Sequence, residues 1–475
     1  MTAAGRPGIH TGVLGEAPIR ELEIALAGSI VGPGDPNYET ARRVWNNAID
    51  KRPALIVRPA STEDVARTIA FARRVGQPIA VRGGAHSAAG FSTCDDGIVL
   101  DLAQLNDVRV DVDSRRAFAG GGSTWKIFDA ATQAHGLATT GGLVSSTGLG
   151  GFVLGGGVGH LVRKYGLTCD NLLSAELVTA DGSIVQTSES LNSELFWALR
   201  GGGGNFGVAT RFELNLHRVG PVVLGGVIFY PGEQTAQVMT GWRDLLPGVP
   251  DELTTKIALA AAPAAPFIPL EWQGKKVASV VACWAGDPTE GQDIVRPLRS
   301  LGTPIADLLG PVRYVNLQQL FDPAWPAGAA NYFTSAFFDR MPDEAVNTVV
   351  DYQRHAANLP VRSELHIHHL GGAITRVPAG TTAFTDRTSN FVLFSVTRTP
   401  GRAELSEHID WARAARDALA TYGKGGMYVN FPGDAREGDV DRSYPPQIHA
   451  RLQAVKNQYD PLNVFRFNIN IRPTL

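Results

Sequence analysis

The sequence predicts an α+β protein built from two domains. Its 475 residues exceed the length of one ordinary domain. Short helix and strand patterns alternate up to about residue 220, and longer elements separated by proline-rich joints follow. Glycine supplies 53 of the 475 residues, about 11% against a usual share of about 7%. Because the glycines gather in two tracts, where a backbone can bend tightly or approach a ligand closely, we expect a ligand-binding protein.

The first domain, 1–220, is predicted from capping residues and short apolar runs. Ser61 precedes an acid-rich turn, so a helix is expected to run from there to about residue 75. A helix before residue 54 and a short one over 194–199 are also expected. Strands are expected at 54–57, 78–81, 98–102, 108–112 and 208–216, with a hairpin formed by 174–178 and 183–186.

The second domain, 221–424, is expected to be α+β as well. The pattern predicts strands at 222–230 and 278–284 and helices at 234–246, 343–356 and 403–422. In the segment 425–475 the sequence pattern again resembles that of the first domain, and it predicts a strand at 427–431 and a helix near 447–459. We therefore expect this tail to return to the first domain.

Charge and cysteine usage exclude several classes of protein. Lys and Arg total 43 against 46 Asp and Glu, with no run of like charge, so a nucleic-acid partner is not expected. The uncharged stretch 136–162 is too rich in glycine to be a membrane span, and the first residues show no secretory signal. Three distant cysteines without a CxxC pair favour a reducing compartment, so a cytoplasmic location is expected.

The first chemical motif runs from Val81 to Gly90, directly after a predicted strand. Gly83, Gly84 and Ser87 allow several backbone N–H groups to converge on an anion such as a phosphate. Arg82 adds positive charge. An ordinary tight turn is the alternative interpretation.

Two further glycine tracts follow. The tract 148–159 has so many glycines that a long flat ligand lying against the backbone explains it better than structure alone. The tract 202–207 contains a literal G-x-G-x-x-G, but a helix is predicted before it and a strand after it. A nicotinamide-binding motif needs the opposite order, so we exclude that interpretation.

A histidine cluster, His366-Ile367-His368-His369, offers a possible metal site. On a strand, His366 and His368 share one face and His369 points away. No carboxylate or third histidine stands at a matching spacing, so pocket lining is favoured over a metal and no metal is expected. Other catalytic signatures, such as G-x-S-x-G, a P-loop and H-E-x-x-H, are absent from the sequence.

Together, these motifs resemble the vanillyl-alcohol oxidase superfamily of FAD enzymes. The closer resemblance is to its berberine-bridge-enzyme-like branch and the bacterial 6-hydroxy-D-nicotine-oxidase-like members. It extends from Pro53 to Pro473. The matching pieces are 82–87, 148–151 with 155–157, 164–167, 170–171, 196–203, 428–430 and 459–463.

The resemblance implies a PCMH-type FAD-binding fold of two α+β subdomains, made by the N-terminal half and the C-terminal tail. An α+β substrate domain, an antiparallel sheet covered by helices, would lie over the flavin ring. His86 stands where the family links a histidine to the flavin 8α-methyl carbon. Val144 stands where many members carry a second, cysteinyl link, and Phe152 replaces a family histidine. A single covalent link is therefore expected, and an oligosaccharide substrate is less favoured.

The residues expected from these motifs and this resemblance to bind the cofactor are Arg82, Gly83, Gly84, Ala85, His86, Ser87, Val144, Ser145, Gly148, Gly151, Gly155, Val208, Tyr428, Asn430 and Asn468. The expected catalytic residues are Tyr428 as base, His368 as the partner that tunes or orients it, and His366 beside it. An ordinary tyrosine is a poor base at neutral pH, so Tyr428 would need such a partner.

The resemblance implies an FAD-dependent oxidase that takes hydride from a small-molecule C–H bond next to oxygen or nitrogen. Dioxygen would reoxidise the flavin, and the chain would act as a monomer or homodimer. A dehydrogenase with another electron acceptor is the first alternative. A metal-dependent enzyme built on the histidine cluster and a catalytically silent flavin-binding protein also stay open.

Overall fold

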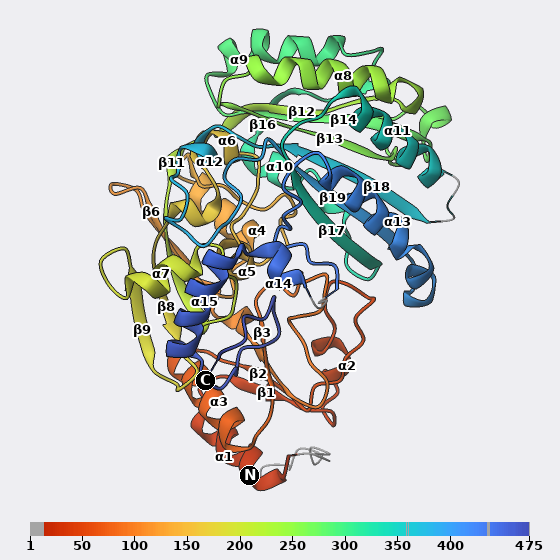
Figure 1. The fold of residues 1–475 in the computed structure, drawn as a ribbon. Helices are drawn as coiled ribbons and strands as arrows, with labels where there is room; N and C mark the ends of the chain where they lie inside the picture. Colours follow the sequence, from red (N-terminus) through yellow and green to blue (C-terminus); the bar gives the residue numbers. More distant parts are fainter. Residues whose placement is uncertain (1–13, 358, 360, 435–437, 475) are drawn as a thin grey trace.

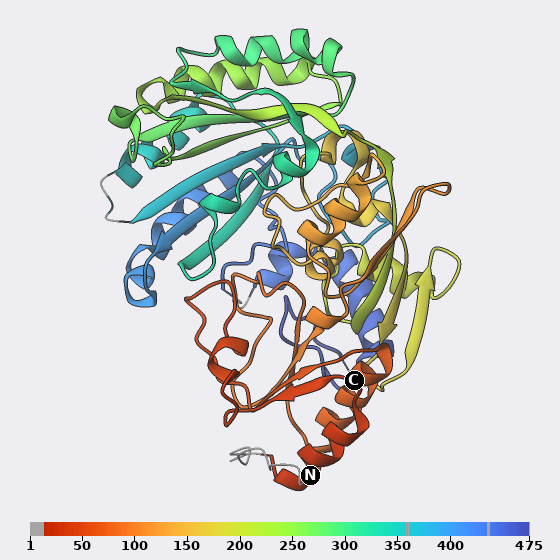
Figure 2. The same cartoon turned by 180° about the vertical axis from the view of Figure 1, so that it is seen from behind.

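The computed structural model describes residues 14–474 except 358, 360 and 435–437. The first and last described segments of the chain both lie in the half of the molecule away from a large sheet and its covering helices (Figure 1). The first and last parts of the chain, drawn in red to yellow and in dark blue, occupy one half of the molecule. The middle part, drawn in green to light blue, occupies the other (Figure 2). This is the architecture expected for a PCMH-type flavoenzyme.

Near the N-terminus, the described chain forms a four-stranded sheet in the order β1-β2-β4-β3. Strands β2, β3 and β4 run parallel, and β1 is antiparallel to β2. The elements of this part are α1 (Glu16–Ala25), β1 (Ser29–Val31), α2 (Tyr38–Ala41), β2 (Leu55–Arg58), α3 (Thr62–Arg74), β3 (Ile79–Arg82) and β4 (Ile98–Asp101). The predicted cap of α3 is confirmed, since Ser61 Oγ accepts a hydrogen bond from the Asp64 N–H at 3.2 Å.

A second sheet, five-stranded among the described residues, has the order β5-β6-β10-β8-β9 and is antiparallel. The predicted hairpin is confirmed as β8 and β9. The elements of this part are β5 (Val108–Asp111), β6 (Arg116–Gly120), α4 (Trp125–Gln133), β7 (Leu137–Ala138), α5 (Leu149–Leu154), α6 (Val162–Tyr165), β8 (Leu172–Val178), β9 (Ile184–Ser188), α7 (Ser193–Leu199), β10 (Val208–Asn215) and β11 (His217–Arg218). Strand β11 pairs with β7.

The middle of the described chain forms an eight-stranded antiparallel sheet, ordered β15-β12-β14-β13-β18-β19-β17, with β16 also paired to β12. Its elements are β12 (Val222–Pro231), α8 (Thr235–Leu245), β13 (Leu253–Ala261), β14 (Lys276–Trp284), α9 (Pro288–Val295), β15 (Ala306–Asp307), β16 (Gly310–Arg313), α10 (Tyr314–Gln318), β17 (Ala330–Phe338), α11 (Asp343–Ala357), β18 (Arg362–His369), α12 (Ala373–Arg376), β19 (Phe391–Thr399) and α13 (Arg402–Ala420).

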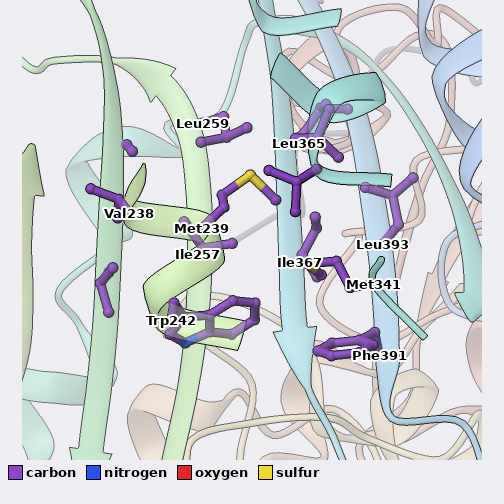
Figure 3. Close-up of a cluster of buried hydrophobic side chains, with 14 of the residues drawn as sticks. Val238, Met239, Trp242, Ile257, Leu259, Met341, Leu365, Ile367, Phe391 and Leu393 are labelled. Carbon is purple, nitrogen blue, oxygen red and sulfur yellow. The ribbon is translucent and has the colours of Figure 1, made fainter. Parts of the chain in front are cut away.

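Helices α8, α9, α11 and α13 cover one face of this sheet, as Figure 1 shows. The core beneath them contains Trp242 and Met239 of α8 against Ile257 of β13 and Ile367 of β18 (Figure 3). Because side chains alternate along a strand, the residues next to Ile257 and Ile367 project from the other face. That second face looks toward the first half of the molecule and carries Lys256 on β13.

The C-terminal segment packs against the first half through α14 (Asp439–Ser443) and α15 (Pro446–Tyr459). Leu452 and Val455 of α15 join the core built on the second sheet. The buried Lys456 Nζ binds the Asn205 carbonyl oxygen at 2.8 Å and Asp460 at 2.6 Å. Within the described residues, no helix is long and apolar enough to cross a membrane.

The strand predicted at 427–431 is wrong. The backbone there is irregular and turns at 429–430. The Phe431 N–H donates a hydrogen bond to the Tyr428 carbonyl oxygen at 2.9 Å. The Tyr428 N–H donates to the Ser335 hydroxyl at 3.0 Å, and not to the backbone of a neighbouring strand. Met427 and Tyr428 are buried, and Val429 to Phe431 are half-buried. Sequence periodicity does not distinguish such a mostly apolar run from a strand.

Candidate active site

A cavity of about 370 Å³ lies between the two halves of the molecule. One side is made by the glycine loops of the first half and by C-terminal residues, including Phe465 and Asn468. The other side is made by the open face of the eight-stranded sheet. Of the predicted site residues, the cavity is lined by Gly83, Gly84, Ala85, His86, Ser87, Val144, Gly148, Gly151, Val208, His366, His368, Asn430 and Asn468.

The loop after β3 has the features of an anion-binding turn. Ala85 adopts a left-handed conformation with φ of +57°, which bends the loop sharply. Among the described residues, none accepts a hydrogen bond from the backbone N–H groups of Gly84 to Ser87. The buried Oδ1 of Asn468 on the same cavity also has no partner in the described structure. Such a row of unpaired donors and acceptors fits a phosphate-bearing, hydrogen-bonding cofactor such as FAD.

Glycine serves two purposes in this region. A Cβ at Gly148 would lie 2.2 Å from the Gly84 backbone nitrogen, so these two loops meet backbone to backbone beside the cavity. By contrast, Gly155 to Gly157 do not line the cavity. A Cβ at Gly155 would lie 2.0 Å from Asn430 Oδ1, so this glycine makes room for a side chain. The prediction that a ligand explains the whole tract is therefore wrong for its second half.

His86 projects from the loop onto the cavity. Its ring stacks on Trp45 at 5.0 Å between centroids, and its Nε2 lies 2.9 Å from the Ser146 hydroxyl. Burial lowers the pKa of His86 to about 4. The imidazole is therefore neutral at neutral pH and keeps a nitrogen lone pair available as a nucleophile.

Two predicted cofactor residues face elsewhere. The guanidinium of Arg82 donates to the carbonyl oxygens of Ala41 at 2.5 Å and Ser92 at 3.3 Å, away from the cavity. It holds loops together there instead of adding charge to the anion-binding turn. Ser145 donates from its backbone N–H at 2.8 Å and from its hydroxyl at 2.6 Å to Asp322, and so joins the two halves of the molecule.

Tyr428 lies behind the cavity lining. Its hydroxyl accepts hydrogen bonds from the Gly157 N–H and from Asn430 Nδ2, each at 2.9 Å. Burial raises the pKa of this phenol well above its usual value. The ring is surrounded by Phe337, Phe384, Phe394 and Phe431. The two donated hydrogen bonds by themselves favour the phenolate, but burial outweighs them and keeps the phenol neutral.

The expected contact between His368 and Tyr428 is not formed. The Phe394 ring packs against both, at 4.8 Å from the His368 ring and 6.1 Å from the Tyr428 ring. Burial and nearby cations lower the pKa of His368 well below its usual value, so its imidazole is neutral. The prediction that His368 tunes Tyr428 directly is wrong because strand β19 places Phe394 between them.

Strand register brings three ionisable side chains onto the cavity wall. In the β13–β18 pairing, Lys256 lies opposite His368, and Ala258 lies opposite His366. The predicted alternation is confirmed, since His369 instead lies 3.1 Å from the Arg163 guanidinium on the other face. Apolar side chains complete this wall: Phe321, Trp325, Phe333, Phe394 and Val396.

Burial and nearby charges shift the pKa values of His366, its partner Glu364 and Lys256. His366 Nε2 lies 3.1 Å from Glu364, and burial lowers the pKa of this histidine, so a neutral imidazole donates to the carboxylate. Burial raises the Glu364 pKa, but the His366 hydrogen bond and nearby cations leave it below its usual value. Burial also lowers the pKa of Lys256 to about 7, so the neutral amine is accessible near neutral pH.

In the part of the chain that the structure describes, no group of three or more His, Cys, Asp or Glu residues is placed to hold a metal ion. His366 has Glu364 as its partner and His369 faces away. The histidine cluster thus contributes two neutral rings to the cavity wall.

Comparison with known proteins identifies the family. The model described as "FAD binding domain" matches residues 53–188, and the one described as "Berberine and berberine like" matches 427–472. The chain is also 31% identical over 470 residues to (R)-6-hydroxynicotine oxidase of Paenarthrobacter nicotinovorans, covering 95% of this chain and 98% of that protein. The chain belongs to the berberine-bridge-enzyme-like family of FAD-linked oxidoreductases.

Solved structures of this family share the whole fold. The structure of 6-hydroxy-D-nicotine oxidase from Arthrobacter nicotinovorans matches with a TM-score of 0.84 at 28% identity, over 94% of this chain and 98% of that one. Glucooligosaccharide oxidase of Acremonium strictum, described with a 6-S-cysteinyl, 8α-N1-histidyl FAD, matches with a TM-score of 0.83 at 23% identity, over 96% and 99%. The second likeness shows the fold alone. The predicted superfamily and the FAD cofactor are confirmed.

Sequence reasoning missed several cavity residues of this oxidoreductase. Lys256 is the most informative, because it is a single basic residue in an otherwise apolar run, 256–262. A lone cation in a buried strand is costly unless it faces a polar site, and that signal was available in the sequence. Trp45, Phe321 and Trp325 come from irregular segments and offered no such signal.

Proposed function

We propose that this family member is an oxidase that holds FAD through one covalent bond at His86. It takes a hydride from a small-molecule C–H bond next to oxygen or nitrogen, and dioxygen accepts the electrons with formation of hydrogen peroxide. The observation that supports this most is that one cavity joins the anion-binding loop and His86 to the open face of the eight-stranded sheet.

The loop of the first half would hold the cofactor. The unpaired N–H groups of Gly84 to Ser87 suit its phosphates or other acceptor groups. A neutral His86 nitrogen suits attachment, and Val144, which has no nucleophilic atom, leaves a single link. When bound, the flavin supplies the two-electron chemistry that no side chain provides.

The sheet wall would hold the substrate. Its aromatic side chains exclude water and favour a small molecule with an apolar or aromatic body. The similarity to hydroxynicotine oxidase supports a small ring-containing substrate over an extended sugar. His366 and His368 would contact the polar part of the substrate as neutral hydrogen-bonding groups.

The role of Tyr428 as base is the weakest of the sequence-based assignments. Its phenol has a raised pKa, and its hydroxyl lies among residues behind the cavity lining. We propose that Tyr428 supports Asn430, whose side chain does reach the cavity. This assignment leaves the proton-accepting group to be found on the cavity wall itself.

Cofactor attachment and the electron acceptor are tested in one preparation. After acid denaturation, the yellow colour should stay with the protein, and a single flavinylated peptide should contain His86. Reduction by a donor under anaerobic conditions, followed by admission of air, should restore the oxidised flavin and release stoichiometric peroxide. Slow reoxidation in air but fast reoxidation by an artificial acceptor would instead identify a dehydrogenase.

We propose a cytoplasmic location on the basis of cysteine chemistry. Cys94, Cys169 and Cys283 are all buried and unpaired with one another. Free thiols of this kind suit a reducing compartment. Fractionation of the native host with a thiol label would test this location.

A further inference from the structure

Lys256 is placed in the cavity without a counter-ion. Its side chain is 7% exposed and lines the cavity from β13. Its Nζ lies 3.9 Å from the centroid of the Phe321 ring. Within the described residues, no carboxylate oxygen lies within ion-pair distance of this amine, and no hydrogen-bond acceptor is its partner.

The surroundings of Lys256 favour its neutral form. Burial is the largest influence on the amine and favours its neutral form, while the nearby Glu364 carboxylate favours the charged form. The titratable groups coupled electrostatically to Lys256 are Glu364, His366 and His368 of β18 and His160 before α6. Glu364 is engaged by His366, so it does not neutralise Lys256 by direct contact.

The cavity also limits the charge of its substrate. Among the described residues that line it, none is Asp or Glu. An alkylamine substrate is a cation in neutral water, and a buried cation needs a carboxylate partner or a strong desolvation penalty results. An alcohol carries no such cost, but its oxidation requires removal of the hydroxyl proton.

We propose that Lys256 is the catalytic residue that accepts the hydroxyl proton of an aromatic alcohol substrate. This inference rests on the proposed oxidase function and names its substrate class. The O–H bond breaks and its proton passes to the Nζ lone pair of Lys256, while the C–H bond gives its electron pair and hydrogen to the bound flavin as hydride. The carbon–oxygen double bond forms, and dioxygen takes two electrons and two protons to become hydrogen peroxide.

The other ionisable groups near the cavity fit the role of base less well. His366 already donates to Glu364, and His368 has a pKa well below neutrality, so each is a weak base at neutral pH. Tyr428 is separated from the cavity wall by Phe394. A base works best when its pKa lies near the working pH, which is the state of Lys256.

The substrate class is tested with matched probes. Benzyl alcohol and cinnamyl alcohol are compared with benzylamine and cinnamylamine as reductants of the flavin in anaerobic stopped-flow experiments on the flavin-loaded enzyme. At least one alcohol should bleach the flavin faster than its amine counterpart. Reduction by amines and not by alcohols overturns the inference while leaving the oxidase proposal intact. Reduction by none of the four also overturns the inference, whereas peroxide release on reoxidation decides the oxidase proposal separately.

The role of Lys256 is tested with two variants and a matched control. Lys256→Met should slow reduction by the best alcohol by about 10²-fold or more, the usual worth of a general base. Lys256→Arg should be as slow, because a guanidinium stays protonated. The control is Lys276→Met on β14, which removes another partly buried lysine. The Nζ of Lys276 donates to the Ser363 carbonyl oxygen at 3.2 Å, outside the cavity. The flavin of this variant should be reduced at the wild-type rate.

The pH dependence separates a base from an anchor. The neutral amine is the active form, so the wild-type rate constant should rise with pH through about 7 and then level off. This rise of the rate constant with pH should be absent in Lys256→Met. Recovery of the rate in Lys256→Arg, or an unchanged rise with pH in Lys256→Met, would show that the residue only holds the substrate. Retention of covalently bound flavin with a native spectrum in each variant establishes that it is folded.

Discussion

The two walls of the cavity are built in different ways. The wall that we propose to hold the flavin comes from several short loops, each a continuous stretch of chain, of which Gly83 to Ser87 is one. The wall that we propose to hold the substrate comes from strands that are distant in sequence, because Lys256 and His368 meet only through the pairing of β13 with β18. Loop chemistry can be recognised within a few residues, whereas the chemistry of a sheet wall depends on its register.

Substitution of His86 should have the largest effect on the wall proposed to hold the flavin. His86→Ala should abolish the covalent bond, so that all FAD is released on denaturation, because no other nucleophile is expected at the flavin. The native variant should still bind FAD through the amide donors of the loop. Absorbance of the supernatant after acid precipitation measures the released flavin. Flavin that stays with the precipitated variant protein would place the link elsewhere.

The close packing of the flavin-facing loops should be sensitive to a single methyl group. Gly148→Ala puts a Cβ 2.2 Å from the Gly84 nitrogen, and such overpacking costs about 1–3 kcal/mol. Gly151→Ala is the matched control for stability, since its Cβ would meet nothing within 4 Å. Thermal unfolding of the apoprotein should show a lower midpoint for the first variant. Equal midpoints would mean that the two loops are not held together.

A substitution at Val144 tests how close the loop 142–147 lies to the flavin ring. Since Val144 lines the cavity, Val144→Cys should restore the second family nucleophile and give a cysteinyl link in a fraction of molecules. Mass spectrometry of flavinylated peptides would detect it, and Val144→Ser serves as a control of similar size without a thiol. A variant with no cysteinyl flavin would indicate that the loop 142–147 holds this position away from the ring.

The smallest effect is expected at Tyr428. Tyr428→Phe removes a hydroxyl that accepts two hydrogen bonds, and leaving their donors unpaired costs about 1–3 kcal/mol in stability. Flavin reduction should slow by less than about tenfold, because a general base is worth about 10²-fold or more. A larger loss, with the Lys256 variants unaffected, would return the role of base to Tyr428.

Most elements with local signals were predicted correctly. Ser61 marks the start of α3, and the turn around Asp181 marks the β8–β9 hairpin. The prediction for the tail is wrong for a different reason, because Tyr428 lies in a mostly apolar, partly buried run that forms no strand. Burial alone produces such a run, and only the contact with Ser335 shows where its backbone hydrogen bonds go.

By itself, the sequence determined the family, the flavin and the loop around His86, because these depend on local backbone freedom and short motifs. It also determined that His366 and His368 share a face, since alternation is a property of any strand. Tertiary structure alone decided that Arg82 turns away, that Phe394 separates His368 from Tyr428, and that Lys256 stands opposite His368 without a counter-ion. Those outcomes depend on strand register and on the burial of side chains between the two halves of the molecule. Both arise only when distant segments pack together, so no single segment of the sequence predicts them.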